Sequence, residues 1–272
     1  MKNTVSITVV IPCYNCVDTI GRAVTSVLEQ TVLPEQIILI DDRSTDQTYD
    51  VITAISLAHS SVKVLQNPVN GGASVARNYG WSEVATKYVA FLDADDCWHP
   101  KKIEVQFNLM EQIPNVAFSG HLVSVMTQVQ RTASELSEKK GIELIGARKL
   151  LLRNCFATSS VMLKKDLPVR FDAEKRRSED YLLWLTLLFS GFEAALIHQP
   201  LGSRFAAPFG EAGLSGNLLS MQAAELETLK RLRKQKYISA IELSLAVTFS
   251  CLKLLRRIAV SGIRNRFRKF YA

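Results

Sequence analysis

The sequence predicts an α/β domain with a Rossmann-like nucleotide-binding sheet, mostly parallel, helices on both faces, and a C-terminal helical extension. Two observations favour this class. Apolar, β-branched segments alternate with segments of helical spacing over about the first 100 residues, which is typical of a parallel sheet. Polar residues follow each expected strand at its carboxyl end, where such sheets bind ligands. The expected strands are residues 4–11, 36–41, 62–67 and 87–96.

The first strand and the helices between strands have recognisable boundaries. Residues 4–11 are β-branched and uncharged, as in a strand buried on both faces, and Pro12 ends the run. The next helix is indicated by apolar residues at helical spacing from Ile20 to Leu28. Residues 44–46 are N-cap candidates for a second helix, and Gly71-Gly72 opens a third.

The second half is less regular. Residues 178–191 predict a helix, with Ser178 suited to the N-cap and Gly191 to the position after the C-cap. We expect one domain over residues 1–215 and a helical, basic extension over 216–272. The other expected elements are strands at 115–126, 158–165 and 195–205, a loop at 131–141 and a helix at 147–154.

The charge distribution argues against a general nucleic-acid binder. The 272 residues include 33 basic and 26 acidic side chains, a net charge of +7. Seven of the basic residues follow Glu242, and no acid does, so the body of the chain is neutral. A nucleic-acid binder needs a broad basic face. A basic tail indicates an anionic surface or partner.

Cysteine usage predicts a reducing compartment. Five cysteines at irregular spacing do not make a disulfide framework, and no signal peptide opens the chain, so we expect a cytoplasmic enzyme. Cys13 and Cys16 form one C-x-x-C. Because no second Cys/His pair accompanies this motif, we interpret it as two small loop residues. The alternative is a metal or redox role.

Three carboxylates lie at the end of the fourth expected strand, in Asp93-Ala94-Asp95-Asp96. Like charges this close raise one another's pKa unless a cation neutralises them. Mg²⁺ and Mn²⁺ bind through one or two carboxylates plus substrate phosphates, so the pattern predicts a metal site and a diphosphate substrate. The alternative is a solvated acidic turn before a helix.

Three further groups lie at or near the same rim. Asp41 and Asp42 could bind a ribose or base, or cap the next helix. Arg77 and Asn78 are close to a helix N-terminus, a position that favours phosphate, although Arg77 could also be a surface residue. Glu179-Asp180 is the candidate acid/base pair, and the alternative is favourable first-turn helix electrostatics.

Five segments in this order resemble the family 2 glycosyltransferases with the GT-A fold. Together they span about 190 residues, and their order makes the match specific where any one motif is weak. The segments are VVIPCYN (9–15), QIILIDDRSTDQT (36–48), NGGASVARNYG (70–80), FLDADDCWHPKKI (91–103) and SEDYLLWLTLLFSG (178–191).

The resemblance implies an inverting, metal-dependent hexosyltransferase that uses a nucleotide-sugar, by default a UDP-sugar, in bacterial cell-surface polysaccharide biosynthesis. It implies Asp180 as catalytic base beside Glu179, and Asp95 as the main metal contact with Asp93 and Asp96. The implied donor-binding residues are Pro12, Tyr14, Asn15, Asp41, Asp42, Arg77, Asn78, Asp93 and Ala94, and the acceptor-side candidates are Thr158, Ser159, Ser160, Trp184 and Arg204.

Two departures from the family pattern bear on function. Arg43 replaces the usual glycine of D-D-G-S, which fits less easily if that turn needs a positive φ. No Q-x-x-R-W follows Glu179-Asp180, and there is no set of long apolar spans, so we expect one sugar per acceptor rather than processive synthesis. The alternatives are a nucleotidyltransferase acting on a sugar phosphate and a non-catalytic sugar-binding protein derived from the fold.

The tail predicts a long amphipathic helix. From Leu245 to Phe270 apolar residues recur at a spacing of three to four, with basic residues along another side. Residues 240–270 therefore suit the anionic inner face of the cytoplasmic membrane and a lipid-linked acceptor. The alternative is a helix packed on the domain with its charges solvated.

Overall fold

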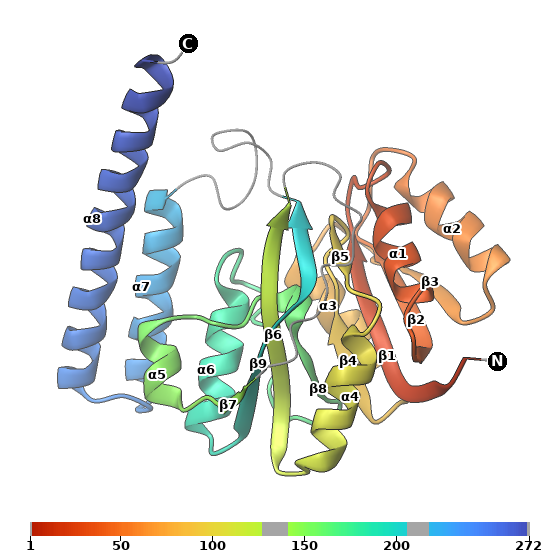
Figure 1. Cartoon of the computed structure of the whole chain (residues 1–272), viewed down its shortest axis with the longest axis horizontal. Helices are drawn as coiled ribbons and strands as arrows, with labels where there is room; N and C mark the ends of the chain where they lie inside the picture. The colour runs from red at the N-terminus through yellow and green to blue at the C-terminus, as the bar shows by residue number, and fades with distance from the viewer. Residues whose placement is uncertain (1, 127–140, 206–217, 271–272) are drawn as a thin grey trace.

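The computed structural model describes residues 2–126, 141–205 and 218–270, and over these it forms a mixed α/β fold (Figure 1). The sheet follows the order β3-β2-β1-β4-β8-β6-β9-β5, with β7 paired to β9. The strands are β1 (Thr4–Cys13), β2 (Leu33–Asp41), β3 (Val62–Gln66), β4 (Tyr88–Phe91), β5 (Asp96–Trp98), β6 (Val116–Met126), β7 (Ile142–Leu144), β8 (Met162–Lys164) and β9 (Glu193–Phe205).

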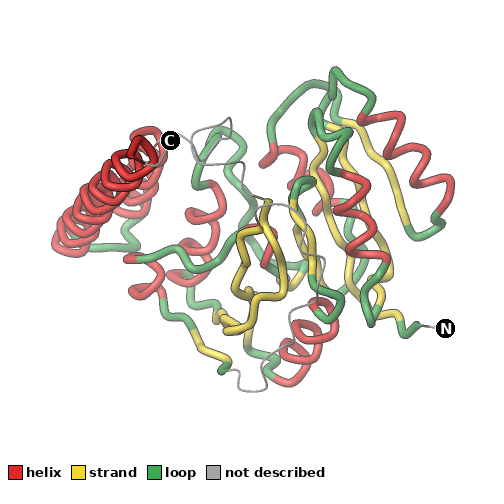
Figure 2. The backbone as a smooth tube through the Cα atoms, turned by 45° about the horizontal axis from the view of Figure 1, so that its top comes forward, coloured by secondary structure: helices red, strands yellow, loops and turns green. Residues whose placement is uncertain are grey.

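Helices cover both faces of this sheet (Figure 2). They are α1 (Ile20–Leu28), α2 (Thr48–Ala58), α3 (Ala73–Ser82), α4 (Lys102–Gln112), α5 (Ala147–Leu152), α6 (Glu179–Phe189), α7 (Leu218–Lys234) and α8 (Ala240–Phe270), with a 3-10 turn at Thr158–Ser160. The fold class predicted from the alternating pattern is confirmed.

The parallel half of the sheet is the half whose strands were clearest in the sequence. β1 pairs in parallel with β2 and β4, and β2 with β3. The second half is mixed, because β8 runs antiparallel to both β4 and β6 while β6 and β9 are parallel. The carboxyl ends of β1 to β4 therefore meet at one edge, as their polar termini predicted.

Two of the expected strands are interrupted. The strand expected over 87–96 ends at Phe91, because the backbone turns between Asp93 and Asp96. The N–H of Asp96 donates to the Asp93 carbonyl at 3.0 Å and closes this turn, and β5 begins at Asp96. The strand expected over 158–165 begins as the 3-10 turn and becomes β8 at Met162. Most of the loop expected at 131–141 lies outside the described residues.

Helix boundaries follow local chemistry with one exception. Gly72 is the N-cap of α3 with φ +84°, and Gly191 follows the C-cap of α6 with φ +90°, a conformation that glycine adopts without strain. Ser178 stands at the N-cap of α6 as predicted, but its φ is +54° and its side chain makes no capping hydrogen bond. The expected N-cap position of Ser178 is confirmed, whereas the N-cap expected among residues 44–46 is wrong, because α2 begins at Thr48 with Gln47 as its N-cap.

The core forms two clusters, one on each face of the sheet. Ile7, Val9 and Ile11 of β1 join one cluster, with α1 and α4, while Val10 joins the other. Successive residues of a strand point to opposite faces, so one apolar run supplies both clusters. Leu229 and Leu232 of α7, Ile238 of the α7–α8 connection and Ala246 of α8 belong to the second cluster, so the C-terminal helices pack on the same core as the sheet.

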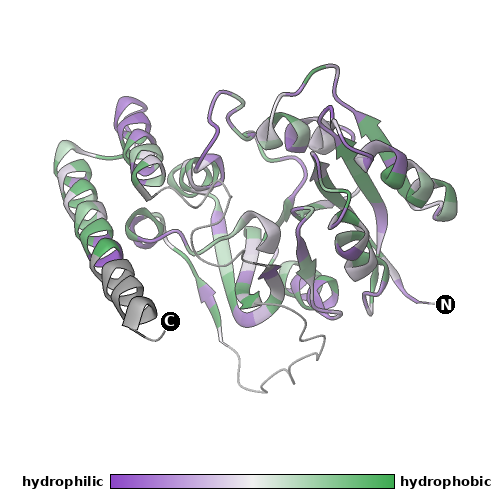
Figure 3. Ribbon diagram, turned by 90° about the horizontal axis from the view of Figure 1, so that it is seen from above, coloured by the Kyte–Doolittle hydropathy of each residue, from purple (hydrophilic) through white to green (hydrophobic). Residues whose placement is uncertain are grey.

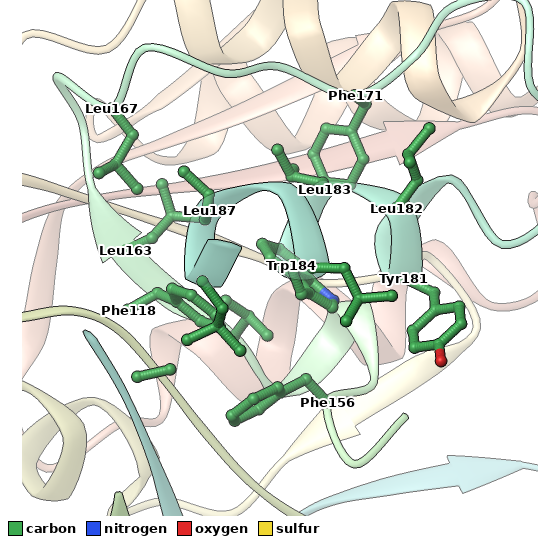
Figure 4. Close-up of a cluster of buried hydrophobic side chains, with 14 of the residues drawn as sticks. Phe118, Phe156, Leu163, Leu167, Phe171, Tyr181, Leu182, Leu183, Trp184 and Leu187 are labelled. Atoms are coloured by element: carbon green, nitrogen blue, oxygen red, sulfur yellow. The ribbon is translucent and has the colours of Figure 1, made fainter. Parts of the chain in front are cut away.

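Helix α6 is anchored in that second cluster by its apolar side (Figure 4). Trp184 is fully buried and stacks on Phe118 with ring centroids 5.3 Å apart, and Phe171 meets it edge-on at 5.9 Å. This packing fixes the helix whose first turn carries Glu179 and Asp180.

Candidate active site

The loop after β1 is tied to the loop after β2. The Asn15 side-chain oxygen accepts from the Thr45 N–H at 2.8 Å, and the Asn15 N–H donates to the Ser44 hydroxyl at 3.1 Å. Between these contacts and the end of β1, Tyr14 stays half exposed. The predicted residues Pro12, Tyr14 and Asn15 therefore lie at the rim, with Tyr14 as an aromatic surface open to a ligand. The expected end of the strand at Pro12 is wrong, because Pro12 stays in register with Ile40 of β2 and β1 continues to Cys13.

Asp42 is a structural anchor for the loop that opens α3. Its carboxylate is buried and accepts from the Gly72 N–H at 2.6 Å, the Gly71 N–H at 2.9 Å and the Asn67 amide at 2.6 Å. Asp41 is equally buried and accepts from Ser44 and Gln66. Hydrogen bonds to ionised carboxylates are among the strongest in proteins, so these acids hold the rim together.

Arg43 has a φ of +61°, so the turn that the family builds with glycine does have the left-handed conformation here. The side chain compensates for this backbone, because its guanidinium donates to the Pro68 carbonyl and to the Gln66 side chain. The departure from D-D-G-S thus changes the residue and leaves the turn intact.

Arg77 connects the acidic turn after β4 to the first turn of α6. Its guanidinium donates to Asp93 Oδ1 at 2.7 Å and to Glu179 Oε1 at 3.1 Å, and the side chain is only 6% exposed. Burial opposes the charge, but the two carboxylates outweigh it and raise the Arg77 pKa. A residue from α3 thereby sets the distance between the predicted metal-binding turn and the predicted base.

The three carboxylates of the acidic turn have different environments. Burial would raise the pKa of Asp93, but Arg77 overcomes it and holds that pKa below its ordinary value. Asp95 is exposed at the rim, and partial desolvation and Asp93 raise its pKa. Asp96 is buried, and desolvation followed by Asp93 raises its pKa to about 7.

These carboxylates do not form a complete protein metal site. Among the described residues, no group of three or more His, Cys, Asp or Glu side chains is arranged to hold a metal ion. In the same part of the chain, neither carboxylate oxygen of Asp96 has a hydrogen-bond partner. An exposed Asp95 and an unsatisfied Asp96 fit a cation that takes its remaining ligands from a substrate, as Mg²⁺ and Mn²⁺ usually do.

Asp180 lies beside the 3-10 turn and directly follows Glu179, the residue that pairs with Arg77. Its Oδ2 accepts from the Thr158 hydroxyl at 3.4 Å, and its Oδ1 from the Tyr181 N–H at 2.7 Å. Burial, followed by the charge of Glu179, raises the pKa of Asp180 to about 6. A carboxylate with this pKa can accept a proton near neutral pH more readily than an ordinary aspartate.

Ser159 links the 3-10 turn to the acidic turn. Its hydroxyl accepts from the Asp93 N–H at 3.2 Å, and its carbonyl accepts from the Trp98 ring N–H at 2.7 Å. Ser160 is fully buried and donates to the Ala157 carbonyl. Of the three acceptor-side candidates in this turn, Thr158 has the hydroxyl nearest the candidate base.

Two other candidates lie away from the open rim. Trp184 is fully buried in the core, because α6 turns its apolar face to the sheet, so we drop its expected acceptor contact. The Asn78 amide donates to the Phe171 carbonyl at 2.7 Å and accepts from the Phe171 N–H at 3.0 Å, which gives it a positioning role. Arg204 is exposed on β9, paired in register with Asp96.

Arg22 and Trp98 are rim residues that the sequence did not single out. The Arg22 guanidinium donates to the Asp95 carbonyl at 3.0 Å, from α1 to the acidic turn. Its only sequence signal was a polar position on an amphipathic helix. Trp98 follows the acidic turn directly, and its ring N–H satisfies the Ser159 carbonyl. All five cysteines are free thiols, so Cys13 and Cys16 form no disulfide.

The fold is that of a GT-A glycosyltransferase. The model of glycosyl transferase family 2 matches residues 8–170, which contain the rim loops and the acidic turn. The chain belongs to glycosyl transferase family 2, and it is a glycosyltransferase. This membership does not favour the nucleotidyltransferase alternative.

Curated relatives and solved structures agree with this assignment. A beta-1,3-glucosyltransferase from Escherichia coli, WfaP, which acts with UDP-Glc on alpha-D-GlcNAc-diphosphoundecaprenol, is 34% identical over 69% of this chain and 72% of its own. TuaG of Bacillus subtilis, a putative teichuronic acid biosynthesis glycosyltransferase, is 31% identical over 69% and 74%. The structure of S. aureus TarS 1–349 with UDP-GlcNAc superposes with a TM-score of 0.66 at 15% identity, over 91% of this chain and 70% of the TarS 1–349 chain.

Proposed function

We propose that this glycosyltransferase is inverting and metal-dependent, and that it moves one sugar from a UDP-sugar to a hydroxyl of a lipid-linked glycan. One observation carries the proposal: Asp180, with its pKa raised to about 6, is held beside the acidic turn through Glu179 and Arg77. This arrangement supplies a base for the acceptor and an electrostatic site for the leaving diphosphate at the same rim of the sheet.

The transfer step is a single displacement. The acceptor oxygen attacks the anomeric carbon from the face opposite the diphosphate, and its proton passes to a carboxylate oxygen of Asp180. The bond from the anomeric carbon to the diphosphate oxygen breaks, and UDP leaves with the electron pair. One displacement inverts the configuration at that carbon, and Thr158, which donates to Asp180, keeps the base oriented.

For the donor, we propose that the base of UDP lies on Tyr14 and that the diphosphate reaches the acidic turn. Tyr14 is the exposed aromatic residue of the first rim loop, and aromatic rings stack readily on planar bases. Asp95 would hold the divalent cation, with Asp93 and Asp96 beside it. When bound, the cation neutralises the negative charge that develops on the departing diphosphate.

For the acceptor, the names of the relatives favour a polyprenol-diphosphate-linked glycan. WfaP and WfgD of Escherichia coli are both described as acting on alpha-D-GlcNAc-diphosphoundecaprenol, at 34% and 30% identity. We propose the same class of acceptor, on the cytoplasmic side of the membrane, where the five free thiols remain reduced.

The test is a donor screen that measures nucleotide release with a polyprenol-diphosphate-GlcNAc analogue, with and without Mn²⁺. We expect UDP release from UDP-Glc that depends on both acceptor and metal. Asp95→Ala should remove metal-dependent donor binding, measured by calorimetry, and Asp166→Ala, at an exposed position, is the matched control. The proposal fails if UDP-, GDP- and dTDP-sugars all give no acceptor-dependent release, or if chelation leaves the rate unchanged.

A further inference from the structure

Helix α8 packs on the domain through one side only. Ala246 and Ser250 are buried, and Leu243 and Val247 pack against the core cluster that contains α6. Polar contacts fix the same side: Gln222 of α7 donates to the Ser250 hydroxyl at 2.8 Å, and Lys253 pairs with Glu225 at 2.7 Å. The described part of α8 therefore has a fixed orientation, with an inner and an outer side.

The outer side is apolar. We call its large residues the outer stripe; they recur every three or four positions, which places them on one face of a helix. Their exposed fractions show that nothing in the described residues covers them. The outer stripe consists of Ile241 at 74%, Leu245 at 63%, Phe249 at 42%, Leu252 at 58% and Leu255 at 62% exposed. Figure 3 shows the hydrophobic colour along the described part of this helix.

The charges beside the outer stripe have one sign. Arg256 and Arg257 are both exposed at its C-terminal end. Glu242, the only acid in the sequence of α8, is paired with Arg148 at 3.0 Å and is therefore neutralised. Lys253 is already paired with Glu225, so the exposed positive charge belongs to the arginines.

We propose that the outer stripe of α8 is a docking surface for an anionic phospholipid membrane. The stripe inserts its apolar side chains at the headgroup boundary, and Arg256 and Arg257 bind lipid phosphates. No helix in the part of the chain that the structure describes is long and apolar enough to cross a membrane, so α8 lies along the surface. A second copy of the chain offers no anionic group to Arg256 and Arg257 along its own outer stripe, whereas lipid phosphates do.

Figure 1 shows where this surface lies on the molecule. The N-terminal half of α8, which carries the outer stripe, runs alongside α7, and the C-terminal half extends past α7 in the direction in which β6 and β9 point. Docking through the outer stripe would therefore place the α7–α8 side of the molecule against the headgroups. The biological purpose of this contact rests on the proposed lipid-linked acceptor, but the contact itself can be measured without catalysis.

The test uses the full chain and sedimentation with vesicles of phosphatidylcholine containing about one third phosphatidylglycerol, an anionic content that attracts juxtamembrane arginines. Wild type should sediment with these vesicles, less so with pure phosphatidylcholine, and less at high salt. The Leu245→Gln/Leu252→Gln double variant should lose at least about tenfold in partitioning, the effect expected for removing one or two buried leucines. Arg256→Gln/Arg257→Gln should lose the dependence on phosphatidylglycerol.

Leu57→Gln, an 85% exposed leucine on α2, is the matched control and should sediment like wild type. UDP release with a water-soluble acceptor analogue should be the same in all variants, which separates this inference from the proposed reaction. Equal partitioning of wild type and Leu245→Gln/Leu252→Gln overturns the proposal. So does a lipid-free wild type that is dimeric by sedimentation equilibrium while Leu245→Gln/Leu252→Gln is monomeric, because the stripe would then bind a second copy.

Discussion

Arg77 donates to Asp93 at 2.7 Å while its other terminal nitrogen donates to Glu179 at 3.1 Å, so one buried guanidinium joins the acidic turn to the first turn of α6. The two carboxylates are far apart in the sequence, and α3 brings their common partner between them. The planar guanidinium fork can serve two acceptors at fixed geometry, which a lysine ammonium does less well.

Arg77→Lys should therefore keep the charge and lose the geometry. We expect kcat/KM to fall about a hundredfold, which is the effect of a small displacement of reacting groups. We also expect the free energy of unfolding to fall by about 3 kcal/mol, because one buried carboxylate is left without a partner. Steady-state kinetics and urea unfolding measure the two effects. Arg153→Lys, at an exposed position, is the control, and a kcat/KM within twofold of wild type for Arg77→Lys would contradict the bridging role.

The pH dependence of transfer should report Asp180. The base must be deprotonated, and its pKa is raised to about 6, first by burial and then by Glu179. Activity should therefore be high above pH 6 and fall about tenfold per pH unit well below it. Asp180→Asn should lower kcat by about 10² to 10⁴ while the donor affinity stays close to wild type.

Glu179→Gln separates this electrostatic account from a merely structural one. Because the Glu179 charge raises the Asp180 pKa, its removal should move the acidic limb of the pH profile to lower pH. A limb that stays at the same pH, or moves upward, would show that Asp180 is not the titrating base. The profile should be taken as kcat/KM for the acceptor at saturating donor.

Asp42→Asn tests the anchoring of the rim. The two buried oxygens of Asp42 accept from Asn67, Gly71 and Gly72, and an amide nitrogen in place of one oxygen would face a donor. The free energy of unfolding should fall by about 2–3 kcal/mol, as expected when a charge-assisted buried network is broken. Equilibrium urea denaturation with Asp166→Asn as an exposed control measures this, and equal stabilities would mean that the network contributes little.

The parallel half of the fold was predictable because its signals are local. A strand buried on both faces appears as an unbroken apolar run, and its end is marked by the polar residues of the rim. The acidic turn was predicted as part of a strand, because its interruption depends on the hydrogen bond from Asp96 to Asp93, which the sequence pattern does not contain.

The site was predictable in its members more than in their partners. The acidic turn and the Glu179-Asp180 pair stand out as unusual acids at element ends. The bridge by Arg77 could not be predicted, because it joins three elements whose relative placement comes from the packing of α6 and α3 on the sheet. Trp184 was expected on the acceptor side, whereas the packing of α6 buries it completely in the core.

The anomeric configuration of the product tests the central claim most directly. With an α-linked UDP-sugar and a polyprenol-diphosphate-GlcNAc analogue, the proton coupling at the new anomeric centre distinguishes the two outcomes by nuclear magnetic resonance. A single displacement assisted by Asp180 predicts a β-linked disaccharide in wild type, formed about 10² to 10⁴ times more slowly by Asp180→Asn. An α-linked product, or a β-linked product formed at the wild-type rate by Asp180→Asn, would contradict the account.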